Sequence, residues 1–264
     1  MFVDTHCHIH DSELTSKSEF SADEIIERAR EAGVETLICV GTSVKSSKEA
    51  QEFTAKRDNC SFSIALHPHE AEKYSKQELN SQMDELDAIV ASSPQKLVAV
   101  GECGLDYFYH SDAEVLAKQE MLFRRHLKIA VESDLPVIFH IRDSFEDFFR
   151  ILDDYKGIRG VVHSFSATEK ELKGALSRGL YVGLNGIMTF TKDQKQLDTA
   201  KLVPADKLLI ETDAPFLTPK PFRGTMCEPK HVILITKFLS ELRGESLAFL
   251  AKQTTKNAKT LFKL

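Results

Sequence analysis

Two histidines near the start of this chain are spaced to bind a metal ion. The segment "FVDTHCHIH" places His6 at the end of a short apolar run and His8 two positions further on. Residues two apart in an extended strand point to the same side, so both imidazoles could face one ion. An HxH pair that ends a buried strand therefore suits metal coordination.

Later apolar runs end in the same kinds of side chain. Each of the following residues comes after such a run and before a predicted loop: His67, Glu102, His140, His163, Glu211 and Asp213. A single histidine at a strand end is more often a hydrogen-bonded structural residue than a ligand. Burying four imidazoles and two acids together without a cation would be very costly, so the joint pattern favours a metal site.

The predicted metal ligands are His6, His8, Glu102, His140, His163 and Asp213. The HxH pair would bind one ion, the other two histidines would supply a second, and the glutamate would bridge cations about 3.5–4 Å apart. Asp213 would also act as the base toward the attacking water. Imidazole and carboxylate donors together suit zinc or manganese and are less typical of magnesium, which prefers oxygen.

The elements that must position these residues alternate along the chain. Apolar runs rich in Val, Ile and Leu predict strands at 2–6, 36–40, 62–66, 97–100, 137–140, 160–163, 181–184 and 208–211. Amphipathic patterns predict helices at 23–32, 44–56, 77–91, 114–132, 145–154, 169–178, 192–202, 231–242 and 246–261. Eight strand–helix alternations favour an α/β fold of the (β/α)₈ TIM-barrel type over an open doubly wound sheet. All the polar strand ends would then open onto one face.

Composition restricts the setting of this site. The chain has 264 residues and a formal net charge of −6, which argues against broad electrostatic adhesion to nucleic acid. Its five cysteines form an odd set with no CxxC pair, which favours free thiols in a reducing compartment. Without a linker, a membrane-length apolar run or a signal segment, we expect a single domain over residues 1–264, a cytoplasmic location and a monomer.

Other candidate residues have simpler interpretations. Four histidines lie away from strand ends and are expected to be structural: His10, His110, His126 and His231. Cys7 and Cys103 adjoin predicted ligands but should point away from them by alternation, so we expect packing residues. The segment "YFYH" at 107–110 could stack on nucleobases or pack its loop, and the sequence leaves both interpretations open.

Seven segments resemble, in order, the conserved blocks of the TatD family of metal-dependent deoxyribonucleases. They are "FVDTHCHIH", "ALHPHE", "GECGLDYFYH", "VIFHIRD", "VVHSFSAT", "YVGLNGIMTF" and "LLIETDAPFLTPKPFRG". The resemblance as a whole covers the chain from residue 2 to about residue 232. The resemblance implies a TIM barrel of the amidohydrolase-like superfamily with two divalent metal ions. It also implies hydrolysis of DNA, with RNA as a further substrate, by exonucleases of the 3′–5′ type that magnesium or manganese supports.

Carried over residue by residue, the resemblance assigns His6, His8, Glu102 and Asp213 to one metal ion. Glu102 would bridge to a second ion held by His140 and His163. The catalytic residues would be Asp213, Glu102 and His67.

The resemblance also suggests residues that contact the substrate. His67 and Arg223 would bind the substrate phosphate, Arg223 through a bidentate contact. Glu211 would orient a ligand histidine from outside the metal site. Arg142 could point into the site or pair with a neighbouring acid, and the sequence does not decide between these.

One segment departs from the family pattern. Where the family often has Arg-Gly-Lys-Arg-Asn-Glu-Pro, this chain has "RGTMCEP", so Thr225, Met226 and Cys227 replace two basic residues and an asparagine. The change removes positive charge from a loop expected to border the substrate. It leaves the predicted ligands untouched.

We therefore predict a divalent-metal-dependent phosphodiesterase that acts on DNA. The nearest alternative is a hydrolase of the same architecture that cleaves a C–N or ester bond in a small molecule. Such barrels often use a carboxylated lysine as the bridge, whereas this chain has Glu102 there. A non-catalytic metal-binding barrel is a second alternative, supported only by the altered loop.

Overall fold

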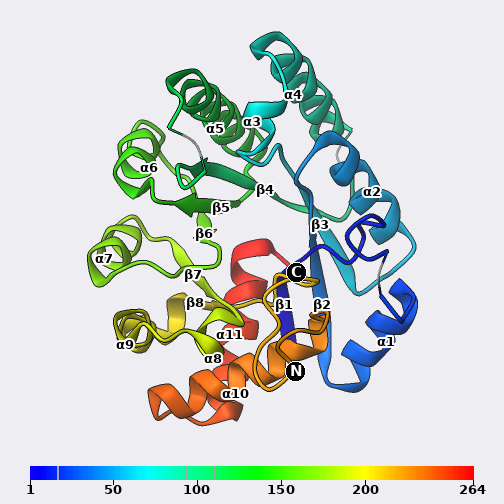
Figure 1. Cartoon of the computed structure of the whole chain (residues 1–264). Helices are drawn as coiled ribbons and strands as arrows, with labels where there is room; N and C mark the ends of the chain where they lie inside the picture. The colour runs from blue at the N-terminus through cyan, green and yellow to red at the C-terminus, as the bar shows by residue number, and fades with distance from the viewer. Residues whose placement is uncertain (17, 93, 110) are drawn as a thin grey trace.

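Eight parallel strands form the centre of the protein. The computed structural model describes residues 1–16, 18–92, 94–109 and 111–264 (Figure 1). The strands are β1 (Phe2–Cys7), β2 (Val34–Val40), β3 (Cys60–Ile64), β4 (Leu97–Asp106), β5 (Val137–Arg142), β6 (Gly160–Val162), β7 (Tyr181–Leu184) and β8 (Leu208–Ile210). They pair in chain order, each parallel to the next. This arrangement confirms the predicted α/β TIM-barrel fold.

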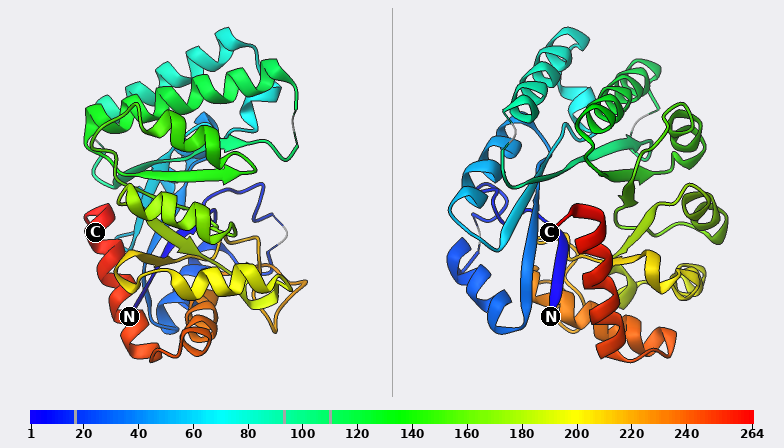
Figure 2. Two further views of the ribbon diagram at one scale, coloured as in Figure 1. Left: turned by 90° about the vertical axis from the view of Figure 1, so that its left-hand side faces the viewer. Right: turned by 180° about the vertical axis from the view of Figure 1, so that it is seen from behind.

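Helices surround the strands on the outside (Figures 1 and 2). They are α1 (Ala22–Glu31), α2 (Val44–Ala55), α3 (Glu70–Lys73), α4 (Lys76–Ala91), α5 (Ala113–Ser133), α6 (Phe145–Leu152), α7 (Glu169–Ser177), α8 (Ile187–Phe190), α9 (Gln194–Leu202), α10 (Val232–Arg243) and α11 (Leu247–Phe262), with the short 3₁₀ turns η1 (Ala205–Lys207) and η2 (Pro229–His231). No helix among the described residues is long and apolar enough to span a bilayer.

Local sequence signals start several of these helices. Ser21 accepts a hydrogen bond from the backbone N–H of Glu24, whose carboxylate accepts one from the Ser21 N–H in return. Ser75 and Glu78 form the same capping box at the start of α4. These reciprocal bonds satisfy backbone donors that a helix leaves free at its first turn.

The last helix closes the amino-terminal end of the barrel. Ala258, Leu261 and Phe262 of α11 pack against inward-facing residues of the strands, among them Ile138 and Leu209. In Figure 2, the view from behind shows α11, in red, lying across the strands on this side. The interior is therefore filled at one end, and the other end carries the polar strand termini.

The first strand meets the segment that follows the last strand through a few contacts rather than a full ladder, among them backbone hydrogen bonds from His8 to Ala214 at 2.6 Å and from Asp213 to His6 at 2.9 Å. Among the described residues, one bridge links them, between Cys7 and Ala214. The buried carboxylate of Asp4 accepts hydrogen bonds from the Thr212 backbone N–H at 2.9 Å and from its hydroxyl at 2.6 Å. Thr5 donates to the carbonyl of Ile210 at 3.1 Å. These contacts hold the two ends of the sheet together.

The predicted strands agree with the observed ones except at some ends. The third strand begins two residues earlier than predicted, and β4 continues six residues beyond Val100, to Asp106. Gly101 pairs with Ile138 and Cys103 pairs with Phe139, so Glu102 is an extra residue in β4. Such a bulge re-aims a side chain, and here it sends the glutamate into the barrel mouth.

Replacing Thr212 with valine should destabilise the protein. The Thr212→Val change keeps the shape but removes the buried hydroxyl that Asp4 accepts from, which we expect to cost about 1–3 kcal/mol of unfolding free energy. Urea unfolding measures this loss. Thr260→Val, on the exposed side of α11, is the control and should change stability by less than about 0.5 kcal/mol. Equal stability of both variants would contradict the role of this contact.

Candidate metal centre

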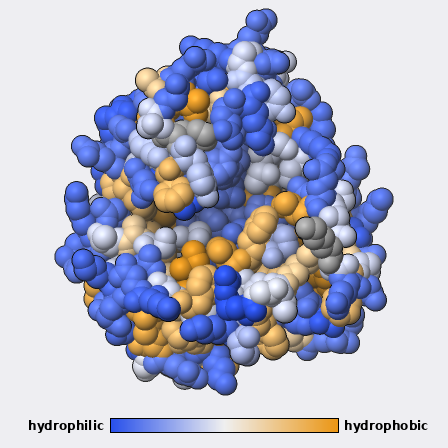
Figure 3. Space-filling model, viewed as in Figure 1, coloured by the Kyte–Doolittle hydropathy of each residue, from blue (hydrophilic) through white to orange (hydrophobic). Residues whose placement is uncertain are grey.

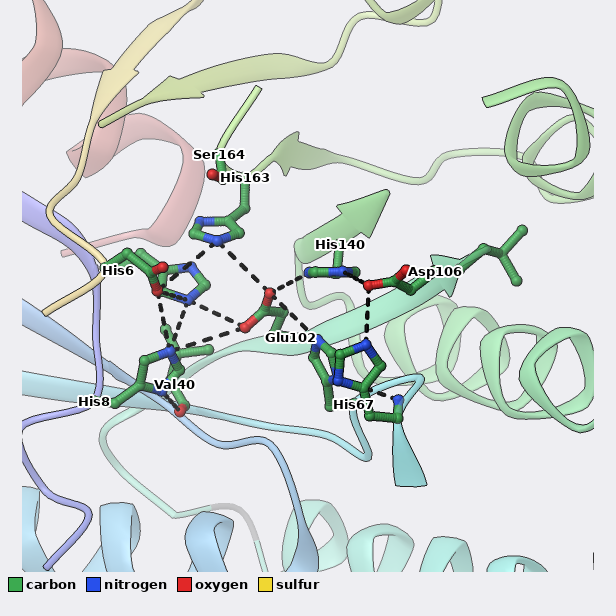
Figure 4. A network of polar contacts seen from close by, with 12 residues as sticks. His6, His8, Val40, His67, Glu102, Asp106, His140, His163 and Ser164 are labelled. Carbon is green, nitrogen blue, oxygen red and sulfur yellow. Dashed lines mark hydrogen bonds and ion pairs between the residues drawn. The ribbon is translucent and has the colours of Figure 1, made fainter. Parts of the chain in front are cut away.

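Side chains from six strand ends meet at the open end of the barrel. Figure 4 shows the carboxylate of Glu102 among the rings of His6, His8, His67, His140 and His163. Alternation explains the convergence, because Ile138 faces the barrel interior and His140, two residues later, faces the same way. In the same manner Leu209 faces inward, and Glu211 and Asp213 follow it at intervals of two.

One group of donors forms around the HxH pair. The Nε2 atoms of His6 and His8 lie 3.2 Å apart. Oδ1 of Asp213 lies 3.4 Å from Nε2 of His8 and 3.6 Å from Nε2 of His6. All three ligand atoms lie within 4.8 Å of one another, which is the spacing of donors around one cation.

Glu102 links this group to the remaining histidines. Its Oε2 lies 3.3 Å from Nε2 of His6, and its Oε1 lies 2.7 Å from Nδ1 of His140. The same Oε1 is 3.6 Å from Nε2 of His163 and 3.7 Å from Nε2 of His67. One carboxylate therefore faces imidazoles on both of its oxygens, as a bridging ligand would.

The donors group differently from the division that the family resemblance implies. The ring of His163 stacks on that of His6 at a centroid distance of 3.6 Å, and the two share Glu102 as a third donor. His140 forms its group with Glu102 and His67 instead. The structure thus brings all six predicted ligands together, and which ion each one binds stays a prediction.

Partners outside the cluster orient three of the histidines. The outer ring nitrogen of His8, Nδ1, lies 2.8 Å from the carbonyl oxygen of Val40. Nε2 of His140 lies 3.0 Å from Oδ2 of Asp106. These acceptors hold a proton on the outer nitrogen, so the inner nitrogen of each ring is the one that would bind a cation, once any proton it carries has been lost.

His163 forms an ion pair with Glu211. Its Nδ1 lies 2.7 Å from Oε1 of Glu211, and that oxygen also accepts a hydrogen bond from the Ser164 backbone N–H at 2.6 Å. The carboxylate fits because Gly183 has no side chain: a Cβ there would collide with Glu211. Glu211 thus takes the orienting position that the resemblance implies.

His67 differs from these three histidines in its hydrogen bonding. Its Nδ1 accepts a hydrogen bond from the backbone N–H of His69 at 3.2 Å. Burial, and next the charge on His140, hold the pKa of His67 well below its usual value, so the ring is neutral. The proton of the neutral ring then sits on Nε2, which faces Glu102. His67 is therefore arranged to donate a hydrogen bond rather than to bind a cation.

Asp106 and His69 belong to the site but were not predicted. Oδ2 of Asp106 lies between Nε2 of His140 and Nε2 of His69, which is 2.9 Å away. Asp106 escaped the prediction because "GECGLD" contains two glycines and reads as the end of a strand. Gly104 is required here, since a side chain would collide with the carbonyl oxygen of His140 on the adjacent strand. The spacing of four residues between Glu102 and Asp106 places both on the same side of an extended strand, and this spacing could have predicted Asp106.

The electrostatics of the cluster favour ionised carboxylates. Burial alone would raise the pKa of Glu102, but the charges on His163 and His6 and a hydrogen bond with His140 hold it well below its usual value. The pKa of Asp213 is lowered too, because His8 and its neighbours outweigh burial. Burial would lower the pKa of His140, but its bonds to Asp106 and Glu102 raise it to about 9.

These residues fit a divalent metal centre. Three imidazoles with inward nitrogens, deprotonated on metal binding, form together with two ionised carboxylates the donor set that zinc and manganese take in proteins. Without a cation the same buried carboxylates depend on imidazolium charges for compensation. The donor chemistry therefore agrees with the sequence prediction of a metal site.

The cluster forms the floor of an open cavity. This cavity has a volume of about 750 Å³, and its lining includes Glu102, His140, His163 and Asp213. The space-filling view in Figure 3 shows it as a central hollow with a hydrophilic interior and hydrophobic residues along its lower edge. A substrate can thus reach the floor from solvent.

Arg223 does not line this cavity. Its guanidinium lies over the ring of Phe190 at 3.8 Å and donates to the carbonyl of Thr218 at 2.9 Å. The altered residues Thr225 and Met226 line a separate cavity of about 640 Å³. The phosphate contact predicted for Arg223 stays a prediction, and the altered loop lies outside the described lining of the metal cavity.

The remaining predicted residues have structural surroundings. His126 is buried, its Nδ1 lies 2.7 Å from the carbonyl of Leu122, and its Nε2 accepts from the Leu66 N–H. Nε2 of the buried His10 lies 3.0 Å from the hydroxyl of Ser46. His231 takes part in a capping box at the start of η2. The core contains Cys7 and Cys103, and His110 lies outside the described residues.

Comparison with known proteins agrees with this geometry. The family model described as TatD related DNase matches residues 3–263. The chain is 36% identical over 259 residues to the "3'-5' ssDNA/RNA exonuclease TatD" of Shigella flexneri serotype 5b, covering 94% of this chain and 96% of that protein. It is 34% identical to the "Uncharacterized metal-dependent hydrolase YabD" of Bacillus subtilis over the full length of both.

A solved structure shows the same architecture. The TatD homologue YjjV from Escherichia coli K12 superposes with a TM-score of 0.88 at 31% identity, covering 100% of this chain and 98% of that one. An organophosphorus hydrolase variant superposes with a TM-score of 0.68 at 12% identity, covering 99% of this chain and 92% of that one, and shares the fold alone.

Replacing Asp106 with asparagine should weaken metal binding. The Asp106→Asn change removes the carboxylate that orients His140, and loss of such a partner typically costs 10–100-fold in metal affinity. Isothermal titration calorimetry with Zn²⁺ or Mn²⁺ measures the change. Asp134→Asn, at an exposed position where α5 ends, is the matched control. Unaltered affinity in Asp106→Asn would show that this contact does not support the site.

Metal binding should release protons at neutral pH. Burial would lower the pKa of His163, but Glu211 and Glu102 outweigh it and raise the value to about 10, while that of His140 is about 9. Both rings are therefore protonated at pH 7 and must each lose a proton to bind a cation. Titration calorimetry in buffers of different ionisation enthalpy should show release of about two protons. Binding without proton release would contradict these pKa values.

The same pKa values predict how the metal-free protein responds to pH. Because both values lie above the 6.5 of an ordinary histidine, the stabilisation from these two imidazolium ions is fully present below pH 6.5. It is lost as the pH rises through 9 and 10. Urea midpoints of the chelator-treated protein should therefore fall over this range. In His163→Gln the fall should be smaller, and an equal fall would contradict the assignment.

Proposed function

We propose that this protein is a 3′–5′ exonuclease of single-stranded DNA, and of RNA, and that it uses two divalent cations. The chain belongs to the TatD-related DNase family and is a metal-dependent hydrolase of ester bonds. The proposal is supported by the relatives named for this activity and by the cluster around Glu102. All the groups come from one chain, residues 1–264, so we propose that a single domain acts as a monomer.

The observation that carries the proposal is the position of Glu102. Its two oxygens face different sets of imidazole nitrogens, His6 on one side and His140 on the other, within 3.3 Å of each. Divalent cations on either side of such a bridge would neutralise charge on a phosphodiester and lower the pKa of a water molecule. This chemistry suits phosphoryl transfer, in which positioning and charge stabilisation supply most of the catalysis.

Each remaining residue then has a defined task. Asp213 is ionised, and its side chain reaches the cavity, so we propose that its carboxylate accepts the proton of the attacking water. His67 carries its proton on Nε2 and would donate a hydrogen bond to a phosphoryl oxygen. Glu211 and Asp106 keep His163 and His140 in the orientation that turns the other ring nitrogen inward.

The small-molecule hydrolase has less support. A barrel that bridges its metals with a carboxylated lysine needs a lysine at the cluster, and the described lysine that lines this cavity is Lys73 on α3. Its ammonium group is 2.7 Å from the carboxylate of Glu70. Turnover of cyclic amides without nuclease activity would favour this alternative over ours.

The altered loop does not support the alternative of a non-catalytic metal-binding barrel. The altered residues Thr225 and Met226 line a cavity between α1 and α10 rather than the metal cavity. Family membership also places the chain among hydrolases. We therefore do not retain a purely binding role.

Single-stranded oligonucleotides labelled at either end test the proposed activity directly. With Mg²⁺, Mn²⁺ or Zn²⁺, a 3′ label should be released in the first turnover as a mononucleotide, while a 5′ label stays on progressively shorter products. Removal of metal with a chelator should abolish cleavage, and restoring it should recover the rate. Release of the 5′ label first, or cleavage that survives chelation, would contradict the proposal.

Replacing Asp213 with asparagine should reduce kcat by at least about 100-fold, since general-base catalysis contributes about 10²–10⁴. The side chain keeps its size, so the fold should be preserved in circular dichroism and urea unfolding. Asp198→Asn, an exposed acid on α9, provides the control. A rate near that of the wild type, with unaltered metal dependence, would rule out Asp213 as the base.

A further inference from the structure

The rim of the metal cavity carries an arginine without an acidic partner. Arg142 ends β5 two residues after His140 and lines the cavity. Among the described residues, every arginine except Arg142 and Arg223 forms an ion pair with a carboxylate: Arg28, Arg30, Arg57, Arg124, Arg125, Arg150, Arg159, Arg178 and Arg243. In a chain with 40 acidic and 34 basic residues, an unpaired guanidinium beside the metal cavity is available to an anionic ligand.

Aromatic rings rather than acids hold this arginine in place. Its guanidinium carbon lies 3.6 Å from the ring centroid of Phe108 and 5.0 Å from that of Tyr109. Stacking on a ring leaves the N–H groups at the edge of the guanidinium free to bind two oxygens of one phosphate. Arg142 is therefore oriented without losing its donors.

The two rings are themselves exposed. Phe108 is 54% exposed and Tyr109 is 61% exposed, although large hydrophobic residues of this kind usually lie inside. Tyr107, by contrast, is fixed by a hydrogen bond from its hydroxyl to Asp147 at 3.0 Å. Tyr109 also lines the metal cavity and contacts the ring of His69. The sequence did not decide whether the rings at 107–109 pack their loop or stack on nucleobases. In the structure Tyr107 packs, whereas the rings of Phe108 and Tyr109 are accessible.

Arg142 also lies at the boundary between two hollows. A second hollow of about 780 Å³ adjoins the metal cavity, and Ile141, Arg142 and Ser166 line both. Three acids, Asp143, Glu146 and Glu171, line the second hollow and outnumber its one lysine, Lys170, which disfavours a phosphate deeper in it. A phosphate next to the scissile one is therefore best held at the boundary, by Arg142.

We propose that Arg142, Phe108 and Tyr109 form a nucleotide subsite beside the metal centre. The guanidinium binds the phosphate adjacent to the scissile bond, and the exposed face of Tyr109 stacks on a base of the single strand. The subsite rests on the proposed nuclease function and assigns its phosphate contact to Arg142 rather than to Arg223. It gives the enzyme a preference for oligonucleotides over small phosphodiesters.

Binding measured without catalysis tests the subsite independently of the proposed activity. The probe is a fluorescein-labelled single-stranded oligothymidylate, followed by fluorescence anisotropy with the intact protein in a chelator. Arg142→Gln should weaken binding at least tenfold and reduce the slope of log Kd against log salt by about 0.7, the value for one phosphate contact on a single strand. Tyr109→Ala should weaken binding by about tenfold and leave the slope unchanged, because stacking carries no charge.

Two further variants make the outcome decisive. Arg30→Gln, an exposed arginine on α1 paired with Glu27, is the matched control and should bind like the wild type. Arg223→Gln compares the two assignments of the phosphate contact and should weaken binding less than Arg142→Gln does. If Arg223→Gln weakens binding and Arg142→Gln does not, or if the wild type does not bind the probe, the proposal is overturned. Urea midpoints close to that of the wild type confirm that each variant folds.

Kinetics with two substrates separate this proposal from the proposed function. For Arg142→Gln, the ratio of kcat/KM for the oligonucleotide to that for bis(p-nitrophenyl) phosphate should fall at least tenfold, through KM. An unchanged ratio would mean that Arg142 acts at the metal centre or not at all, and would overturn the subsite. Arg142-dependent binding in a protein that hydrolyses no oligonucleotide would sustain the subsite and contradict the exonuclease activity.

Discussion

The structure depends on how a buried carboxylate is compensated. Glu102 projects from a bulge into a ring of imidazoles, and burial of its charge without positive partners would cost several kcal/mol. To compensate this charge, ring nitrogens of His6, His140 and His163, which come from three different strands, lie within about 4 Å of the Glu102 carboxylate. Closure of the barrel brings those strand ends to one point, so the charge compensation of Glu102 depends on the topology of the fold.

Orientation is supplied from outside the cluster. His8, His140 and His163 each direct one ring nitrogen to an outer acceptor, namely a carbonyl oxygen or a carboxylate. Two glycines make this possible: Gly183 leaves room for Glu211, and Gly104 allows β4 to approach the backbone of His140. These two glycines carry no functional group, yet they determine which nitrogen of each histidine ring faces the cluster.

Strand alternation explains why so much of the site could be predicted. The polar residues that follow the apolar runs occur at intervals of two, so His6, His140 and Asp213 were expected on the face where the structure has them. Asp106 was missed because the predicted strand stopped at Val100, six residues before the observed end of β4. The surroundings of Arg223 depend on a loop that has no periodicity, and those of His163 depend on ring stacking, which spacing does not encode.

The contacts that complete the barrel join residues 208 positions apart, Asp4 from the first strand and Thr212 after the last. The helix that fills the amino-terminal end of the barrel is made of the final residues of the chain. The first strand pairs with β2 close by in the sequence, but its other edge stays open until the residues that follow β8 reach it. Closure of the barrel accordingly depends on contacts of very long sequence separation, whose loop-closure entropy makes them slow to form.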